Sequence, residues 1–192
     1  MRFRAALIGI VACALAATGC AGKDDAVGLP SPTLAAAASF IVTSTDFEDG
    51  AALPESAKAN AFGGQCKGDN LNPELSWTGA PEGTVAYAIT VIDISANNFV
   101  HWTKANIPAT TTEVPGGGAD ALAGFGGHTG NSDGTYFGPC PPGPDHQYIF
   151  TVYALDATLG LDANFGISAL DDALAQHSLA EASITGLAGA TE

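Results

Sequence analysis

Runs of apolar and β-branched residues alternate with Gly- and Pro-rich connections along most of the chain. The clearest run spans residues 85–92 and is almost continuously apolar, which is typical of a strand covered on both faces. Shorter runs of the same kind predict further strands at residues 40–44, 74–77, 100–107, 147–155 and 182–187. Because the connections carry turn residues and no helical pattern, the sequence predicts an antiparallel β-sandwich and not a βαβ unit.

One segment near the C-terminus has the period of a helix. Leu170, Leu174 and His177 repeat at spacings of four and three, which gives an apolar stripe along one face. The run from Ser168 to Asp171 resembles a capping box with Asp in the Glu position, so we expect Ser168 to cap the helix. The predicted fold class is therefore mainly β, with one or two short C-terminal helices.

The first 39 residues carry the pattern of an export signal and a linker. Residues 1–20 begin with two arginines, continue as a short apolar run and end in Ala-Thr-Gly-Cys, which is typical of a secretory signal too short to span a bilayer. The end of this run resembles a bacterial lipobox, so we expect Cys20 to be lipid-modified in an exported cell-envelope lipoprotein. Residues 21–39 offer little to bury and are predicted to be a flexible tether. Residues 40–192 then form one domain.

Acidic residues dominate the charge of the chain. Without the signal, four lysines face twenty acidic residues, which gives the mature protein a net charge of about −16. Such a protein is repelled by nucleic acid and by anionic lipid headgroups. We therefore expect no nucleic-acid partner, and a membrane attachment that depends on the lipid at Cys20 alone.

Two cysteines, Cys66 and Cys140, remain once Cys13 leaves with the signal and Cys20 carries the lipid. An exported protein meets an oxidising compartment, so a Cys66–Cys140 disulfide is the expected pairing. The alternative is a reactive thiol or a metal-binding pair. A metal pair needs further ligands that the sequence does not supply.

The stretch at residues 136–155 joins a rigid loop to a strand. Four prolines at residues 139–144 exclude a helix there. His146 and Tyr148 follow at the start of the strand, two residues apart, so their side chains point to the same face of the sheet. We interpret this stretch as one wall of a pocket.

Two more polar residues lie where predicted strands end or begin. Asp93 ends the run at residues 85–92, and His101 follows eight residues later, so a hairpin would bring the two together. With His146 and Tyr148 they form a set that can hold an anion. A protonated imidazole and a phenol donate hydrogen bonds to phosphate oxygens, while a carboxylate fixes the imidazole tautomer. The alternative is that the histidines are structural residues.

An ordered series of motifs extends over most of the domain. It consists of Asp-Asn-Leu-Asn-Pro-Glu-Leu-Ser-Trp-Thr-Gly-Ala-Pro at residues 69–81, His101-Trp102 with Asn-Ile-Pro-Ala at 106–109, and Gly-Pro-Cys-Pro-Pro ahead of His-x-Tyr at 138–148. This series, between residues 43 and 186, resembles the phosphatidylethanolamine-binding protein family in its bacterial, Raf-kinase-inhibitor-like branch. The resemblance implies a sandwich of that family's type with a small anion pocket. Its implied wall and rim residues are Asp93, His101, His146, Tyr148, Pro139 and Pro141.

The function that this resemblance implies is that of a non-catalytic, lipid-anchored binding protein of the cell envelope. Its expected partner is a small anionic or phosphorylated ligand, with a protein partner as a second kind. A protease or kinase inhibitor that acts through its loops is one alternative. A metal-assisted hydrolase is another, although the sequence lacks the spacings of common metal sites and of a Gly-x-Ser-x-Gly elbow. We expect no cofactor and no metal.

Overall fold

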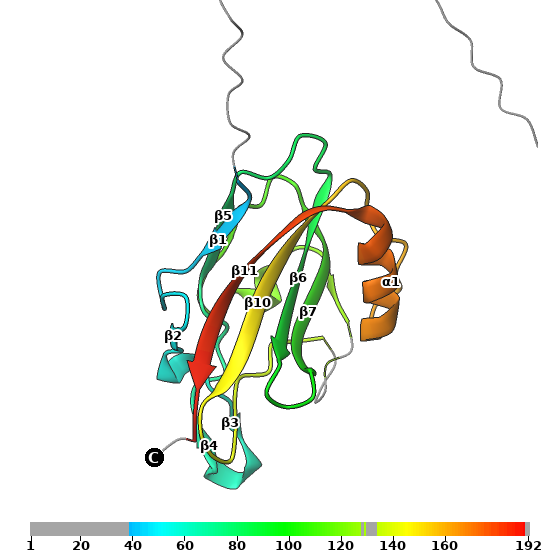
Figure 1. Cartoon of the computed structure of the whole chain (residues 1–192). Coiled ribbons are helices and arrows are strands. Elements are labelled where there is room, and N and C mark those ends of the chain that lie inside the picture. The colour runs from blue at the N-terminus through cyan, green and yellow to red at the C-terminus, as the bar shows by residue number, and fades with distance from the viewer. Residues whose placement is uncertain (1–38, 128, 130–133, 191–192) are drawn as a thin grey trace, which may run out of the picture. The chain divides into compact units, whose positions relative to one another are not determined.

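The computed structural model describes residues 39–127, 129 and 134–190. The predicted signal, Cys20 and all of the tether except Ser39 lie outside these residues, so the domain boundaries stay predictions. The described part of the chain is mainly β, with eleven strands, three short 3-10 helices and one α-helix. Figure 1 shows the strands layered through the middle of the domain, with the α-helix on one side.

The larger of the two main sheets has six strands. All neighbouring strands in it are antiparallel except β11 and β2, which are parallel. The long strands β11, β10, β6 and β7 form its centre (Figure 1). In spatial order the six strands are β2 (Ala51–Ala52), β11 (Ser178–Ala188), β10 (His146–Leu155), β6 (Ala86–Asp93), β7 (Phe99–Pro108) and β9 (Phe125–Gly126).

A smaller antiparallel sheet packs against one face of the larger sheet. Its strands, in spatial order, are β1 (Ile41–Thr43), β5 (Leu75–Thr78) and β8 (Glu113–Val114). Trp77 of this sheet shares a buried cluster with Tyr87 and Phe150 of the larger sheet, and the Trp77 and Tyr87 ring centroids are 5.3 Å apart. Buried aromatic surface of this kind holds the two sheets together. The sandwich predicted from the sequence is confirmed.

The central strand β6 is buried on both faces, as its nearly continuous apolar sequence predicts. One face joins the cluster between the sheets. On the other face, Ala88 lies in a second buried cluster with Leu155 of β10 and with Leu170 and Leu174 of α1 (Ile167–His177). The two leucines of the predicted stripe therefore pack on the sheet, and His177 does not join them.

The first turn of α1 differs from the predicted one. Gly166 is the N-cap, with an extended backbone and no side-chain cap. The backbone N–H groups of Ala169 and Leu170 both donate to the Gly166 carbonyl, so Ser168 lies inside the first turn and the predicted capping box is wrong. The last strand also begins earlier than predicted, at Ser178 directly after the helix, where the sequence has no apolar alternation to mark it.

The remaining elements are too short to leave a periodic pattern, and the sequence did not predict them. Two of them pair as an antiparallel hairpin, which follows β2 in the chain. Its 3-10 turn carries Phe62, which lines the candidate site. These elements are β3 (Asn60–Ala61), β4 (Cys66–Lys67), η1 (Glu55–Ala57), η2 (Phe62–Gly64) and η3 (Ala119–Ala121).

Candidate functional site

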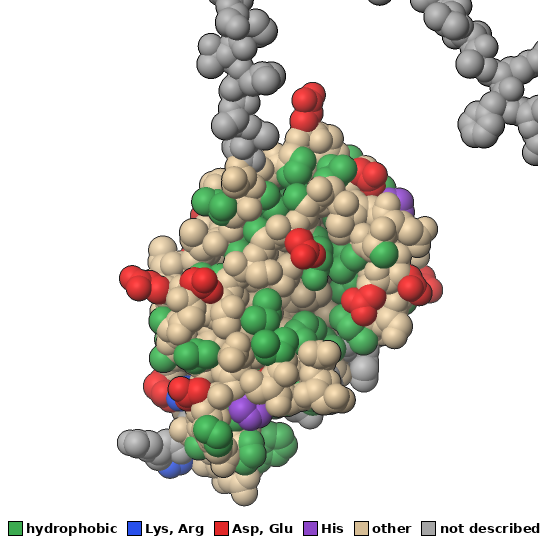
Figure 2. All heavy atoms as spheres, viewed as in Figure 1, with side chains coloured by type: hydrophobic (Ala, Val, Ile, Leu, Met, Phe, Trp, Pro, Cys, Tyr) green, Lys and Arg blue, Asp and Glu red, His purple; other side chains and the backbone are tan. Residues whose placement is uncertain are grey.

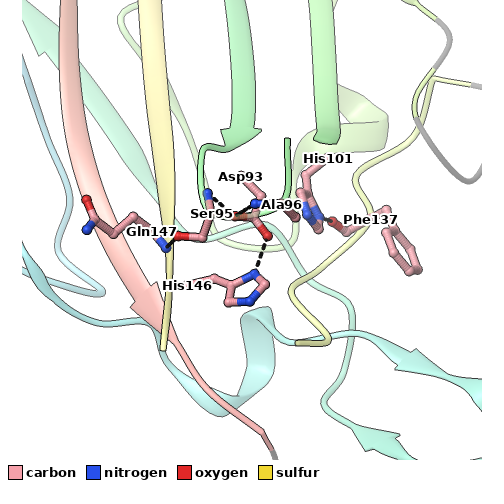
Figure 3. Close-up of polar contacts among 7 residues, drawn as sticks. All are labelled: Asp93, Ser95, Ala96, His101, Phe137, His146 and Gln147. Atoms are coloured by element: carbon pink, nitrogen blue, oxygen red, sulfur yellow. Dashed lines mark hydrogen bonds and ion pairs between the residues drawn. The ribbon is translucent and has the colours of Figure 1, made fainter. Parts of the chain in front are cut away.

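Asp93 forms the floor of the candidate site at the end of β6. Its Oδ1 accepts hydrogen bonds from the backbone N–H groups of Ser95, at 2.8 Å, and Ala96, at 3.1 Å. Its Oδ2 accepts the Nδ1–H of His146 at 2.7 Å (Figure 3). A carboxylate that is only 3% exposed is costly to bury without partners. These donors compensate for that burial and fix the direction of the carboxylate.

A β-bulge places His101 on the same side of the sheet. Val91 of β6 pairs with Trp102, but the next residue of β6 pairs with Val100, so His101 is an extra residue in β7. A bulge re-aims the side chain of the extra residue. The His101 ring accordingly meets the edge of the Tyr148 ring, with centroids 5.0 Å apart.

The Nδ1 atom of His101 lies 2.7 Å from the carbonyl oxygen of Phe137. A carbonyl oxygen only accepts, so Nδ1 carries the proton and Nε2 is left for a ligand. The ring stacks on the Phe137 ring, with centroids 5.8 Å apart, and meets the edge of Phe99 at 4.9 Å. Burial lowers the pKa of His101 from its usual value near 6.5, against the opposing effects of the Phe137 hydrogen bond and the Asp93 charge. The positive field of His146 adds to the lowering.

His146 and Tyr148 begin β10, where Tyr148 pairs across the strands with Asp93. The Tyr148 side chain is buried, and burial, the Asp93 charge and a hydrogen bond to Asp93 all raise the pKa of its phenol. Tyr148 therefore stays protonated beside the Asp93 carboxylate. It stands behind the pocket wall and supports it.

The pocket itself has a volume of about 200 Å³. Of the six predicted residues, Asp93, His101, His146 and Pro141 line it. Pro139 is not among its wall residues; it is buried, and its carbonyl oxygen accepts the Ala59 N–H at 2.9 Å. The other wall residues, which the sequence did not predict, are Phe62, Ala96, Phe99, Phe137, Cys140 and Pro142.

These unpredicted wall residues are mostly apolar. Phe99 and Phe137 stand next to residues that the motifs singled out, two positions before His101 and one before Gly138. Their positions beside these motifs could have identified them as wall residues from the sequence. Phe62 lies in a stretch without periodicity, and nothing in the sequence pointed to it.

The segment that carries Phe137 is fixed by contacts with a distant part of the chain. Asn70, itself in the left-handed region with φ 57°, accepts the Gly138 N–H at 2.8 Å through Oδ1 and donates through Nδ2 to the Tyr136 carbonyl at 3.1 Å. A Cβ at Gly138 would collide with the Ala57 carbonyl oxygen, so only glycine fits there. The acceptor for His101 is thereby held in place.

A disulfide joins Cys66 of β4 to Cys140 of the Pro-rich loop, with their Cα atoms 5.8 Å apart. This is the pairing expected from the sequence. It ties the hairpin that carries the wall residue Phe62 to the Pro-rich loop, between two cysteines that are 74 residues apart in the chain.

His177 lies outside the site. Its Nδ1 is 2.9 Å from the Asp156 carboxylate, at the C-terminal end of α1. Among the described residues, no group of three or more His, Cys, Asp or Glu side chains is placed to hold a metal ion. In the same part of the chain, no helix has the length and apolar character of a membrane span.

The fold and the site together define a class of protein. It is a mainly β sandwich with a small pocket at one end of its central sheet. In this pocket a carboxylate orients an imidazole, and a Pro-rich loop closes one side. The family model "Phosphatidylethanolamine-binding protein" matches residues 43–189. The chain belongs to the phosphatidylethanolamine-binding protein family, and the resemblance read from its motifs is confirmed.

Bacterial relatives agree with this assignment. The UPF0098 protein YbcL of Escherichia coli (strain K12) is 38% identical over 163 residues, which cover 79% of this chain and 88% of YbcL. The solved structure of E. coli YbcL, described as a new member of the mammalian PEBP family, matches with a TM-score of 0.72 and 33% identity over 79% of this chain and 99% of that chain. "Putative lipoprotein LppC" of Mycobacterium tuberculosis (strain ATCC 25618 / H37Rv) is 36% identical over 167 residues, covering 82% of this chain and 74% of LppC.

Proposed function

We propose that this protein is a non-catalytic binding protein that holds the phosphoryl group of a small ligand in the pocket at Asp93, His101 and His146, and that it takes up a proton as the ligand binds. The orientation of the two imidazoles carries the proposal. Each donates its Nδ1–H to a fixed acceptor, the Phe137 carbonyl for His101 and the Asp93 carboxylate for His146. Each therefore offers Nε2 to a ligand.

The protonation state of Nε2 decides what it can bind. When Nδ1 carries the only proton of a ring, Nε2 has a lone pair and can only accept a hydrogen bond. Since burial lowers the pKa of His101, that ring is neutral near pH 7 in the absence of a ligand. A fully ionised phosphoryl group has no proton to donate. Binding therefore requires one more proton, and the protonated ring then donates a charge-assisted hydrogen bond.

The surroundings of the pocket favour such a complex. Both Asp93 oxygens already accept hydrogen bonds, and the dipoles of these donors partly offset the negative charge that an incoming anion meets. The walls are mainly aromatic rings and prolines, and a low local dielectric strengthens the hydrogen bonds that form between them. A volume of about 200 Å³ suits a headgroup and is too small for a whole lipid.

Attachment to a membrane belongs to the same proposal. The described residues contain three lysines and no arginine, and two of these, Lys58 and Lys104, are buried. Figure 2 shows acidic side chains spread over one face of the domain, with very little basic surface. An acidic surface gives no attraction to anionic lipid. The lipobox-like sequence at Cys20 and the name of the relative LppC support a lipid anchor in the cell envelope instead.

Calorimetric titration with O-phosphorylethanolamine at pH 6.0 tests the proposal. The His146→Ala variant should bind at least about tenfold more weakly than the wild type, because it loses one hydrogen bond of about 1.5 kcal/mol to the phosphoryl group. The matched control His177→Ala, which removes a histidine outside the pocket, should bind as the wild type does. Equal affinity in wild type and His146→Ala would contradict the proposal. Phosphorus NMR of the same samples should show an intact ligand, whereas released phosphate would support the hydrolase alternative.

A further inference from the structure

A second cavity lies on the face of the larger sheet that carries α1, beside the first turn of that helix. Figure 1 shows that α1 runs along only part of the long strands, and its buried cluster reaches no further along β6 than Ala88. Thr90 and Ile92 continue the same face, because side chains two residues apart in a strand point to the same side. We call the cavity that they border the outer cavity. Its volume is about 280 Å³, and its lining residues are Thr90, Ile92, Asn98, Tyr153, Ile167 and Asp171.

The outer cavity is separate from the pocket at Asp93. Asp93 directly follows Ile92 in β6, so its side chain points to the opposite face of the sheet. In the described part of the chain, the outer cavity and the pocket have no lining residue in common. What the outer cavity binds is therefore independent of the phosphoryl site.

Tyr153 of β10 forms an aromatic wall of the outer cavity. Burial raises the pKa of its phenol from the usual value near 10, against hydrogen bonds with Thr90 and Thr151 that lower it. Thr151 in turn contacts Ser183 of β11, with their hydroxyl oxygens 2.9 Å apart. This row of hydroxyl groups across β6, β10 and β11 holds the ring in place, and the phenol stays neutral at physiological pH.

Asp171 of α1 gives the outer cavity a negative charge. Among the lining residues that the structure describes, it is the one that is charged. Burial raises the pKa of its carboxyl group, and the charge of the neighbouring Asp172 adds to this rise. The charges of Asp171 and of Glu181, the cross-strand partner of Tyr153, also raise the pKa of the phenol. Because no basic residue of the described lining offsets this field, the outer cavity favours a cation and repels an anion.

The rest of the lining selects among cations. Ile92 and Ile167 are half-buried and present apolar surface next to the Tyr153 ring. A hydrocarbon chain would cover the isoleucines, and a cationic group at its end would contact the ring. A primary ammonium group has three donors, which the Asp171 carboxylate and the side-chain oxygen of Asn98 can accept. A hydrated metal ion would leave the apolar surface uncovered.

We infer that the outer cavity binds a primary ammonium group carried on a short aliphatic chain. The ammonium group lies between the Asp171 carboxylate and the Tyr153 ring, and the chain lies against Ile92 and Ile167. A free diamine and the lysine side chain of a protein partner share this chemistry. Either cation is drawn to a domain whose surface is acidic and carries few basic residues.

NMR titration of the nitrogen-labelled protein with pentylammonium and with pentan-1-ol, at pH 7.0 and low ionic strength, tests the inference. Both probes have the same chain, and only the first carries a charge. Pentylammonium should shift the amide signals of the outer cavity and bind at least about fivefold more tightly than the alcohol, because only the cation gains an ion pair and a cation–π contact. Asp171→Asn should lose most of this preference. The matched control Asp162→Asn removes the same charge at an exposed position outside the cavity and should keep it.

A second variant tests the aromatic wall. Tyr153→Leu keeps an apolar side chain but removes the ring, so pentylammonium should bind it more weakly while pentan-1-ol binds about as before. Equal affinity of the wild type for the two probes would overturn the inference, as would a preference that Asp171→Asn retains in full. Shifts confined to residues outside the outer cavity would overturn the site.

Two further ligands separate the sources of the ammonium group. Cadaverine represents a free diamine, and the amide of Nα-acetyl-lysine represents a lysine side chain within a protein. Tighter binding of cadaverine would support a free diamine as the ligand, and tighter binding of the lysine derivative would support a protein partner. Failure of both to shift the signals of the outer cavity would overturn the inference, and the phosphoryl site would be unaffected.

Discussion

The affinity of the pocket at Asp93, His101 and His146 for a phosphodiester should increase as the pH falls from 7.5 to 5.5, with His101 as the main source of the change. Burial lowers the pKa of His101 in the free protein, and a bound anion raises it. Between these two values the complex holds one proton more than the free protein. Binding is therefore tighter at lower pH, and the sign of the dependence follows from the direction of the pKa shift.

The size of the effect follows from proton linkage. Each proton taken up changes the affinity by at most about tenfold per pH unit, or about 1.4 kcal/mol. Over the two units from pH 7.5 to 5.5, His101 alone accounts for up to about 100-fold.

Glycerophosphoethanolamine is a suitable ligand, because the charge of a phosphodiester stays constant over this range, whereas a phosphate monoester titrates near pH 6. Calorimetry in buffers with different ionisation enthalpies counts the protons taken up. The key variant is His101→Asn, whose amide can still donate to the Phe137 carbonyl but has no titrating nitrogen. We expect its proton count to be about one lower than that of the wild type, and that of His177→Ala to be unchanged.

Two results would refute this reasoning. One is an affinity that does not depend on pH in the wild type. The other is a proton count that His101→Asn leaves unchanged, which would place the titrating group elsewhere.

Three further predictions concern stability and anchoring. Replacing both Cys66 and Cys140 with Ser should lower the free energy of unfolding by up to about 4 kcal/mol, because the disulfide closes a loop of about 75 residues in the unfolded chain; urea denaturation measures this, and an unchanged midpoint would contradict it. The wild type should lose stability as the pH falls below about 6.5, because unfolding frees His101 to take up a proton; His101→Asn should lose less over pH 7.5 to 5.5. Palmitate should label the full-length chain, whereas Cys20→Ser should show no label, and a label retained there would exclude Cys20 as the acceptor.

The sequence predicted the long strands because the apolar pattern of each strand matches the way its two faces are covered in the sandwich. The run that became β6 is apolar throughout since both of its faces are covered. The sequence placed the start of α1 wrongly because serine is a residue type that often caps helices. In the structure the N-cap position is occupied by Gly166, with an extended backbone. The capping preference of a single residue does not predict where a helix begins when the packing of that helix decides its first turn.

The polar half of the site was also predictable, and the apolar half was predictable only where it adjoins the motifs, at Phe99 and Phe137. Asp93, His101 and His146 are residue types with recognisable chemistry at strand ends, where a sheet brings its polar residues together. The bulge that turns His101 toward Tyr148 left no sequence signal, since one extra residue in a strand does not change its composition. Phe62 reaches the pocket through a strained turn and a disulfide across the fold, which are long-range features that no local pattern encodes.

The most direct test of the account is NMR of the imidazole nitrogens during titration with O-phosphorylethanolamine. Long-range proton–nitrogen spectra report which nitrogen of each ring carries a proton. At pH 7 without ligand, His101 should have a protonated Nδ1 and an unprotonated Nε2. Saturation with ligand should protonate Nε2 of His101 and shift the Nε2 signal of His146, while His177 stays unchanged. Binding that leaves the His101 and His146 signals in place would contradict the central claim that these two rings hold the phosphoryl group.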